Sequence, residues 1–237
     1  MASELKPTAD LLRRFSLLSG LPEPALNLLA SQAGLRRYRR REVVLEAGQL
    51  APGVCFLFEG RLQGVDFTLD GREVGLYFVS PGGFCGELGL FDGKQQPEFV
   101  ITLAPSLVVN LPMPALRQVM HEAPALMQAF CQRLAERVRT LTEQRNLLAL
   151  SSIPQRVCAQ LWLLSRELGD AKQKPLTLDN PPTHQELAIM LNLSRETVTR
   201  VFQTLQARQI VKRDGSSRLL ILNLGQLKKL AEGEEAP

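Results

Sequence analysis

The chain has 237 residues, which is enough for one large domain or two modest ones. Apolar residues make up 45% and charged residues 22%; this composition is ordinary for a globular protein and excludes a disordered chain or a disulfide-dense secreted scaffold. The formal net charge is +4, and residues 152–230 alone hold 12 basic and 6 acidic residues. A basic excess there is typical of a nucleic-acid-binding module or of a solvated basic surface.

No run of eighteen or more apolar residues occurs, so the sequence predicts no transmembrane helix. Residues 1–10 lack the basic and then apolar pattern of a signal peptide, so we expect a cytoplasmic protein with no membrane partner. The four cysteines are scattered and only two histidines are present, so we expect no metal site. The cysteines are interpreted as structural thiols, with a redox sensor as the alternative.

The first half of the chain predicts helices followed by strands. Residues 8–33 carry the apolar pattern of two short helices, broken by two prolines. The arginine-rich run at 36–41 predicts either the basic outer face of a first strand or a nucleic-acid contact. Short apolar segments punctuated by Gly then predict an antiparallel β-barrel or roll. Its strands are expected at 43–45, 54–58, 62–69, 74–79, 100–103 and 107–111.

Residues 124–150 change to a seven-residue repeat. Met127, Leu134, Leu141 and Leu148 occupy one position of the seam, and Cys131, Val138 and Arg145 occupy the other. The helix would have about 26 residues and a length of about 40 Å, which is longer than a small roll needs. A narrow apolar seam on such a helix predicts a dimerisation helix, with a helix packed only on its own chain as the alternative.

The C-terminal third carries the pattern of a helix-turn-helix. A break at 151–154 precedes a predicted helix at 153–168 and a polar loop with a short strand at 176–178. Thr183 and Glu186 have the spacing of a capping box, Asn192 lies in the expected turn, and Ser194 is placed to cap a second helix. The shared core would consist of Leu187, Leu193, Val198, Val201 and Leu205, with Ala188 at the crossing.

The second helix of this motif presents polar side chains from its N-terminal end, where recognition helices contact bases. An arginine pairs with guanine through two hydrogen bonds, and a glutamate accepts from cytosine. The segments 210–213 and 218–222 predict a two-stranded wing with basic flanks suited to phosphate. We therefore expect double-stranded DNA as partner, contacted by Thr183, His184, Ser194, Arg195, Glu196, Thr199, Arg200 and Arg213.

Two motifs carry a resemblance to a known family. Residues 81–91 (PGGFCGELGLF) resemble the phosphate-binding cassette, and residues 194–200 (SRETVTR) the recognition helix, of the Crp–Fnr transcription regulators, which are cyclic-AMP-receptor-like proteins of bacteria. The resemblance covers about residues 9–222. It implies an α+β fold, with an N-terminal antiparallel β-roll of the double-stranded β-helix or jelly-roll type, a long dimerisation helix and a C-terminal winged helix-turn-helix.

The same resemblance implies how the chain is organised and what it binds. The N-terminal helices with the cyclic-nucleotide-binding-like roll, the dimerisation helix and the DNA-binding domain are expected at 1–123, 124–151 and 152–237. A homodimer would bind a palindromic operator with TGTGA-like half-sites, read by Arg195, Glu196 and Arg200, and would contact RNA polymerase. The sequence shows no catalytic constellation and no P-loop, so we expect no enzyme.

The effector pocket that the resemblance implies consists of Gly86, Glu87, Leu88, Glu98, Arg137, Leu141 and Thr142. In the family an Arg-Ser pair neutralises the cyclic phosphate, whereas Pro97 and Glu98 fall at those positions here. A carboxylate there has the wrong sign for a phosphate. We therefore expect allosteric control through the roll by another nucleotide or small molecule, or by none, rather than by cyclic AMP. The alternatives are a true cyclic-nucleotide-responsive regulator and a ligand sensor whose helix-turn-helix serves protein interaction.

Overall fold

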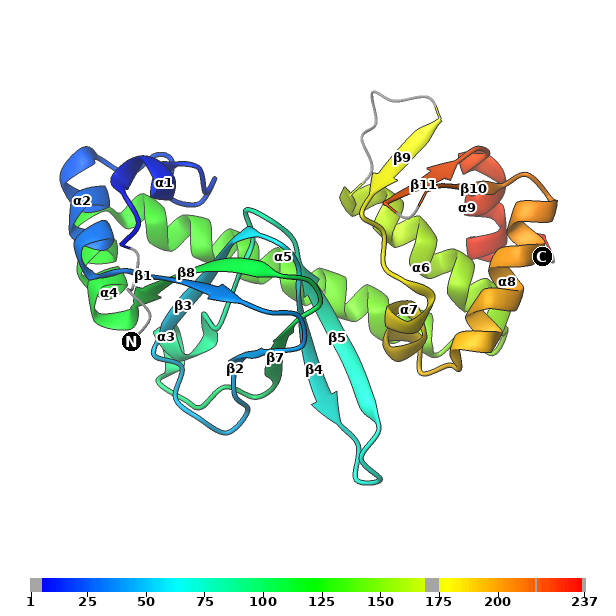
Figure 1. Ribbon diagram of the computed structural model, residues 1–237, viewed down its shortest axis with the longest axis horizontal. Helices are drawn as coiled ribbons and strands as arrows, with labels where there is room; N and C mark the ends of the chain where they lie inside the picture. The colour runs from blue at the N-terminus through cyan, green and yellow to red at the C-terminus, as the bar shows by residue number, and fades with distance from the viewer. Residues whose placement is uncertain (1–5, 169–174, 216, 236–237) are drawn as a thin grey trace. The chain divides into compact units, whose positions relative to one another are not determined.

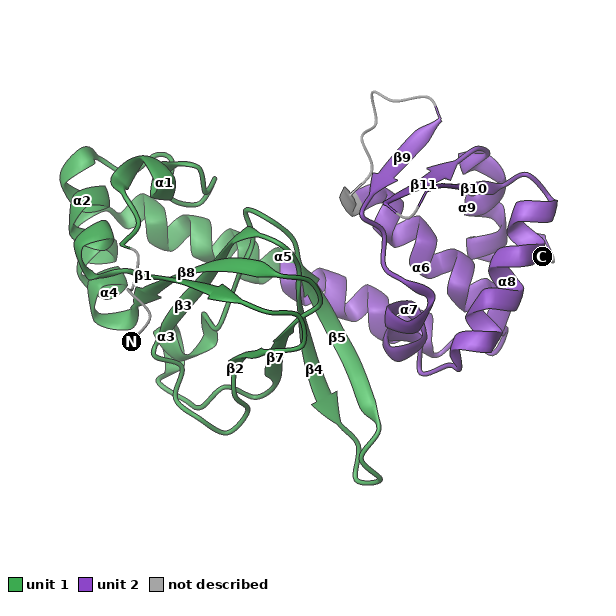
Figure 2. Ribbon diagram, in the orientation of Figure 1, with its two compact units in different colours: residues 1–136 green, residues 137–237 purple. Residues whose placement is uncertain are grey.

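The computed structural model describes residues 6–168, 175–215 and 217–235 (Figure 1). The chain divides into two compact units, residues 1–136 and 137–237, and the boundary lies inside one helix, α5 (Pro124–Leu148) (Figure 2). Within the described ranges, no helix is long and apolar enough to cross a membrane. The predicted domain limits after residues 123 and 151 stay predictions.

The first unit contains two four-stranded antiparallel sheets. One has the order β1 (Gly34–Tyr38), β8 (Ser106–Pro112), β3 (Gly53–Glu59) and β6 (Phe84–Cys85); the other has the order β2 (Val43–Leu45), β7 (Phe99–Thr102), β4 (Leu62–Phe67) and β5 (Glu73–Val79). One buried cluster takes side chains from both sheets, among them Leu57 of β3, Val108 of β8, Leu62 of β4 and Val100 of β7. The sheets therefore face each other across a common core, as the predicted roll requires.

Strand β3 takes part in two cores. Cys55 and Leu57 lie between the sheets, whereas Val54 and Phe56 lie in a second cluster, because successive strand side chains point to opposite faces. Helices cover that second face: α1 (Ala9–Arg13), α2 (Glu23–Gln32), α3 (Leu88–Asp92), α4 (Met113–Glu122) and the start of α5. The two helices expected in residues 8–33 are confirmed, whereas α3 and α4 were not predicted.

The arginine-rich run forms the end of a strand and a turn. Arg36 and Arg37 lie in β1, and the following three arginines form a turn in which all three side chains are exposed. The turn is held by Thr102, because the Arg41 amide donates to the Thr102 carbonyl at 2.8 Å and the Thr102 hydroxyl donates to the Arg39 carbonyl. The strand interpretation of this run is therefore confirmed.

The second unit has a core of its own. Helices α6 (Ile153–Leu168), α7 (His184–Leu191), α8 (Arg195–Ala207) and α9 (Leu224–Glu232) accompany an antiparallel sheet of order β10 (Val211–Asp214), β11 (Arg218–Ile221) and β9 (Leu176–Asp179). Leu147, near the end of α5, is buried in the same cluster as Val157 of α6 and Val198 of α8.

Most of the elements predicted for the second unit are present in the structure. The helix at 153–168, the short strand, the helix-turn-helix and the wing are confirmed, and so is the α+β class of the whole chain. Helix α9 was not predicted, although its buried Leu227, Leu230 and Ala231 have helical spacing. Ser216 in the predicted wing turn, and residues 169–174 of the predicted polar loop, lie outside the described residues.

Candidate nucleic-acid interface and effector pocket

Helix α7 begins at a complete capping box. The Thr183 hydroxyl accepts from the Glu186 amide at 3.2 Å, and the Glu186 carboxylate accepts from the Thr183 amide at 2.9 Å. Two backbone donors that a helix start leaves open are thereby satisfied. The Thr183 hydroxyl, predicted to contact DNA, therefore also fixes the position of the helix.

The tight turn between α7 and α8 depends on Asn192. Asn192 adopts the left-handed conformation, with φ 52° and ψ 50°, and the Leu193 amide donates to the Ala188 carbonyl at 2.9 Å. Asparagine tolerates this conformation better than most residues. The Ser194 hydroxyl then accepts from the Thr197 amide at 3.1 Å and caps α8. The start of the recognition helix is therefore held rigidly from both sides of the turn.

Helix α8 buries one face and exposes the predicted reading face. Val198, Val201, Phe202 and Leu205 are buried, whereas Arg195, Glu196 and Arg200 are exposed. In the described part of the chain, neither of these two arginines forms an ion pair. Two guanidinium groups and one carboxylate thus project from the first two turns, where a recognition helix reads base edges.

Glu196 is held in its anionic form. Its pKa is lowered, first by the hydrogen bond from its own backbone amide, then by the hydrogen bond from the Ser194 side chain, and further by the charges of Arg195 and Arg200. An ionised carboxylate only accepts hydrogen bonds. Glu196 is therefore suited to the cytosine amino group, which is a donor.

His184 and Thr199, two further predicted contact residues, lie within hydrogen-bond distance of each other. Nδ1 of His184 lies 2.9 Å from the Thr199 hydroxyl oxygen, and both side chains are partly buried. The Thr199 hydroxyl also donates to the Arg195 carbonyl at 2.8 Å. These two polar groups are already engaged within the protein.

The wing follows α8 as the hairpin of β10 and β11. Lys212 is exposed, and Arg213 is partly buried. Arg218 pairs with Asp179 of β9 at 3.4 Å, so the wing is tied to the third strand of the sheet as well. Lys212 lies in the segment 210–213 that was predicted as a basic flank of the wing.

In the first unit, the predicted cassette forms a turn that needs glycine. Gly86 has φ 82°, and a Cβ there would lie 2.7 Å from the Leu45 side chain. Glu87, at the start of α3, is 1% exposed, whereas Leu88 is 37% exposed. The cassette therefore buries the carboxylate of Glu87 and leaves Leu88 partly open to solvent.

Glu98, at the predicted phosphate position, is buried and engaged. The Tyr77 hydroxyl donates to the Glu98 carboxylate. The Tyr77 ring lies against Gly64 of β4, where any Cβ would overlap the ring. A partly buried tyrosine therefore pairs with a buried carboxylate, and the sequence analysis missed Tyr77 because its partner is 21 residues away.

The three predicted pocket residues of α5 belong to the second unit. Arg137 is partly buried and Leu141 is exposed, while the Thr142 hydroxyl donates to the Val138 carbonyl at 2.9 Å. The seam of α5 is strongly exposed at Met127, Val138, Leu141 and Leu148, with Val138 63% exposed. Polar residues normally fill such an exposed face of a helix, so this apolar stripe departs from the usual pattern.

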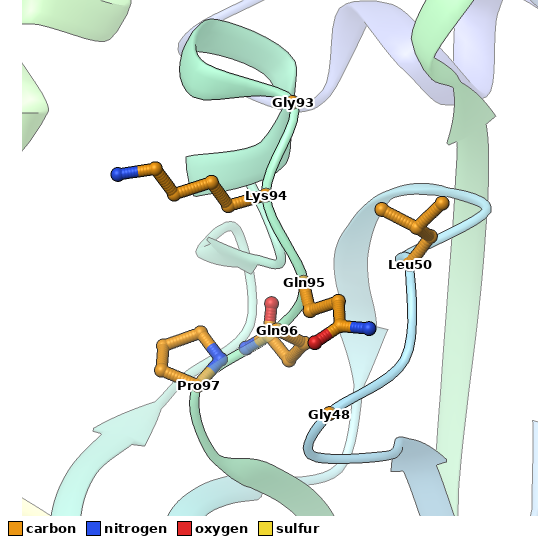
Figure 3. Close-up of a pocket in the computed structure, with 7 residues that line it drawn as sticks. All are labelled: Gly48, Leu50, Gly93, Lys94, Gln95, Gln96 and Pro97. Atoms are coloured by element: carbon orange, nitrogen blue, oxygen red, sulfur yellow. The ribbon is translucent and has the colours of Figure 1, made fainter.

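A hollow of about 620 Å³ lies at the surface of the first unit, lined by Gly48, Leu50 and residues 93–97 (Figure 3). The Gln95 side chain points toward the loop that carries Leu50, whereas the Lys94 side chain points away from it. None of the predicted pocket residues lines this hollow. Among the residues described, no group of three His, Cys, Asp or Glu side chains is placed to hold a metal ion.

Two family models match the chain. Residues 35–123 match the cyclic nucleotide-binding domain, and residues 155–230 match the Crp-like helix-turn-helix domain. These ranges contain the cassette and the whole α7–α8 motif, respectively.

Known proteins are similar to this chain over more than four fifths of its length. The cAMP-activated global transcriptional regulator CRP of Pasteurella multocida is 26% identical over 196 residues, covering 82% of this chain and 93% of that protein. A CRP/FNR-family transcriptional regulator of Thermus thermophilus is 29% identical, with a TM-score of 0.58 and coverage of 84% and 98%. FixK2 from Bradyrhizobium japonicum shares the fold, with a TM-score of 0.74, 21% identity and coverage of 84% and 96%.

These relatives are transcription regulators rather than enzymes. The order of a nucleotide-binding-type roll, a long helix and a helix-turn-helix is also the order found here. The chain belongs to the Crp–Fnr family of DNA-binding transcription regulators.

Proposed function

We propose that the chain acts as a homodimer that binds a palindromic operator with TGTGA-like half-sites. The observation that carries this proposal is the capped helix α8, which exposes Arg195, Glu196 and Arg200 while its opposite face is buried. Each arginine can bind a guanine through two hydrogen bonds, and the glutamate can accept from cytosine. The basic wing and Arg213 contact phosphate and set the orientation on the duplex.

The dimer forms through α5. Its exposed seam repeats every seven residues, which places the apolar side chains along one stripe of a 25-residue helix. A second copy of the same helix supplies a matching stripe in a two-fold symmetric contact. Two recognition helices then read two half-sites about one helical turn of DNA apart.

The effector is not cyclic AMP. Glu98 and Tyr77 occupy the place from which the cyclic phosphate would have to be neutralised, and Glu98 is 5% exposed. Two like charges about 4 Å apart repel by about 4 kcal/mol at an effective dielectric constant of about 20. The roll therefore responds to another small molecule or works without one. It changes the placement of the recognition helices through α5, and the dimer acts on transcription by contacting RNA polymerase in the cytoplasm.

The test is fluorescence anisotropy with the full-length protein and a labelled palindromic duplex, compared with a scrambled duplex of equal length. The titration is repeated with excess cyclic AMP. Specific binding that is unchanged by cyclic AMP is the expected result. Equal affinity for both duplexes would favour a helix-turn-helix that serves protein interaction, and a large gain with cyclic AMP would contradict the argument from Glu98.

A further inference from the structure

His184 lies at the first position of α7 and contacts helix α8. Its Nδ1 atom is 2.9 Å from the hydroxyl oxygen of Thr199, and its ring centroid is 4.4 Å from that of Phe202. Both partners lie on the recognition helix. The imidazole therefore links the start of one helix of the motif to the first half of the other.

Both hydrogen bonds of the Thr199 hydroxyl can form at once in only one tautomer of the imidazole. A threonine hydroxyl has one proton, and the Thr199 hydroxyl donates it to the Arg195 carbonyl at 2.8 Å. The contact with His184 is then a hydrogen bond only if Nδ1 of the ring carries a proton and donates. A continuous chain results, from Nδ1 of His184 to the Thr199 oxygen and on to the backbone of Arg195.

The surroundings of the other ring nitrogen, Nε2, make a second proton on the ring unfavourable. Nε2 of His184 is buried and has no hydrogen-bond partner among the described residues. A neutral ring leaves only an acceptor there, whereas protonation would create a buried donor without an acceptor. The charged groups that face the ring are Arg213 of β10 and Arg195 of α8, and both are cationic. Burial first, and then these two arginines, lower the pKa of His184 below its ordinary 6.5.

We propose that His184 is a positioning residue for DNA reading: its neutral ring fixes the first turn of the recognition helix through Thr199. Protonation of the buried Nε2 drives the ring out to solvent and so breaks this bond. This inference rests on the proposed function, since it concerns the same DNA interface. It assigns His184 a role inside the protein instead of a contact with phosphate. The two roles differ in sign, because a cationic histidine on a phosphate strengthens DNA binding in acid, whereas loss of the positioning bond weakens it.

The experiment measures operator affinity from about pH 8 to about pH 5.5 at fixed salt, with the full-length protein. Wild type is expected to lose affinity severalfold, and only at the acid end of this range, because the pKa of His184 lies below its ordinary 6.5. The variant His184→Asn provides an amide donor close to the position of Nδ1 but does not titrate. It should bind within about threefold of wild type at the high pH and show a flatter pH profile.

Thr199 supplies the matched pair of variants. Thr199→Ser keeps the hydroxyl and should retain affinity, whereas Thr199→Val keeps the shape, breaks the chain of hydrogen bonds and should weaken binding by about three- to tenfold per half-site at about pH 8. A salt titration gives a second readout. His184→Asn should leave the slope of log affinity against log salt unchanged, because no phosphate contact is lost.

Three results would overturn the inference: tighter binding of wild type in acid, identical pH profiles of wild type and His184→Asn, or a salt slope reduced by about one unit per site. Failure of the proposed function looks different, because wild type would then show no operator preference at any pH. In that case the ¹⁵N shifts of the His184 ring still decide the matter. A proton on Nδ1 supports the chain of hydrogen bonds, and a proton on Nε2 contradicts it.

Discussion

The two units place their charged side chains in opposite ways. In the helix-turn-helix, Arg195, Glu196 and Arg200 are exposed, and the polar groups that support them are caps and a turn. In the roll, Glu87 and Glu98 are almost fully buried, and Glu98 accepts a hydrogen bond from Tyr77 of β5. The first arrangement leaves the side chains of α8 free to contact another molecule. In the second arrangement the two carboxylates lie in the interior of the roll.

The largest expected effect comes from the helix that both units share. Replacing Val138 and Leu141 together by Glu puts charges into the exposed seam and should convert the proposed dimer into a monomer at micromolar protein, because two like-charged stripes cannot pack. Sedimentation velocity measures the change. Arg139→Glu, off the seam on the same helix, is the control and should stay dimeric; a wild type that sediments as a monomer would refute the seam interpretation.

The second largest effect is expected at the exposed side chains of α8. Arg195→Ala removes the proposed base contact in each half-site and should cost about 1–3 kcal/mol there, mostly as lost preference for the operator over a scrambled duplex. Anisotropy with both duplexes measures the loss. Lys212→Ala, on the wing, should instead weaken both complexes alike, since a phosphate contact carries no sequence information. If Arg195→Ala weakened binding to the operator and to the scrambled duplex equally, Arg195 would not read the sequence.

A smaller effect tests the buried half. Gly64→Ala would drive the Tyr77 ring away from β4, and such overpacking typically costs about 1–3 kcal/mol. Urea unfolding followed by far-UV circular dichroism should show this loss. Trp162 is the only tryptophan and packs against the core of the second unit, so its fluorescence transition should hardly move. Gly20→Ala is the control, because nothing lies within 4 Å of its Cβ; a loss as large as that of Gly64→Ala would exclude the Tyr77 explanation.

The smallest effect concerns the turn. Asn192→Ala forces alanine into the left-handed region and should lower the free energy of unfolding of the second unit by about 1 kcal/mol. Asn192→Gly should be nearly neutral, since glycine adopts this conformation readily. The Trp162 fluorescence transition in urea reports both variants. If Asn192→Gly destabilised as much as Asn192→Ala, the asparagine side chain rather than the backbone would be responsible.

The sequence predicted the second unit better than the first because its signals are local. Thr183 and Glu186 are three residues apart, and Asn192 and Ser194 lie within one turn, so a short window contains the whole motif. The contact of Tyr77 with Gly64 and Glu98 depends on the pairing of β4 with β5 and β7, which the spacing of residues does not reveal. Helix α4 was missed although Met113, Leu116 and Val119 are buried at helical spacing, because the strand of residues 106–112 leads directly into it.

Leu147 has a consequence for building new regulators. Its side chain lies in the core of the DNA-binding unit although its helix begins at residue 124. A chimera that joins a foreign sensor to this chain at the predicted limit of residue 152 would omit it and leave a cavity, and the loss of a buried leucine side chain costs about 2–5 kcal/mol. If the junction is placed before residue 147, the complete core is transferred. The part that can be moved to another protein therefore begins within α5.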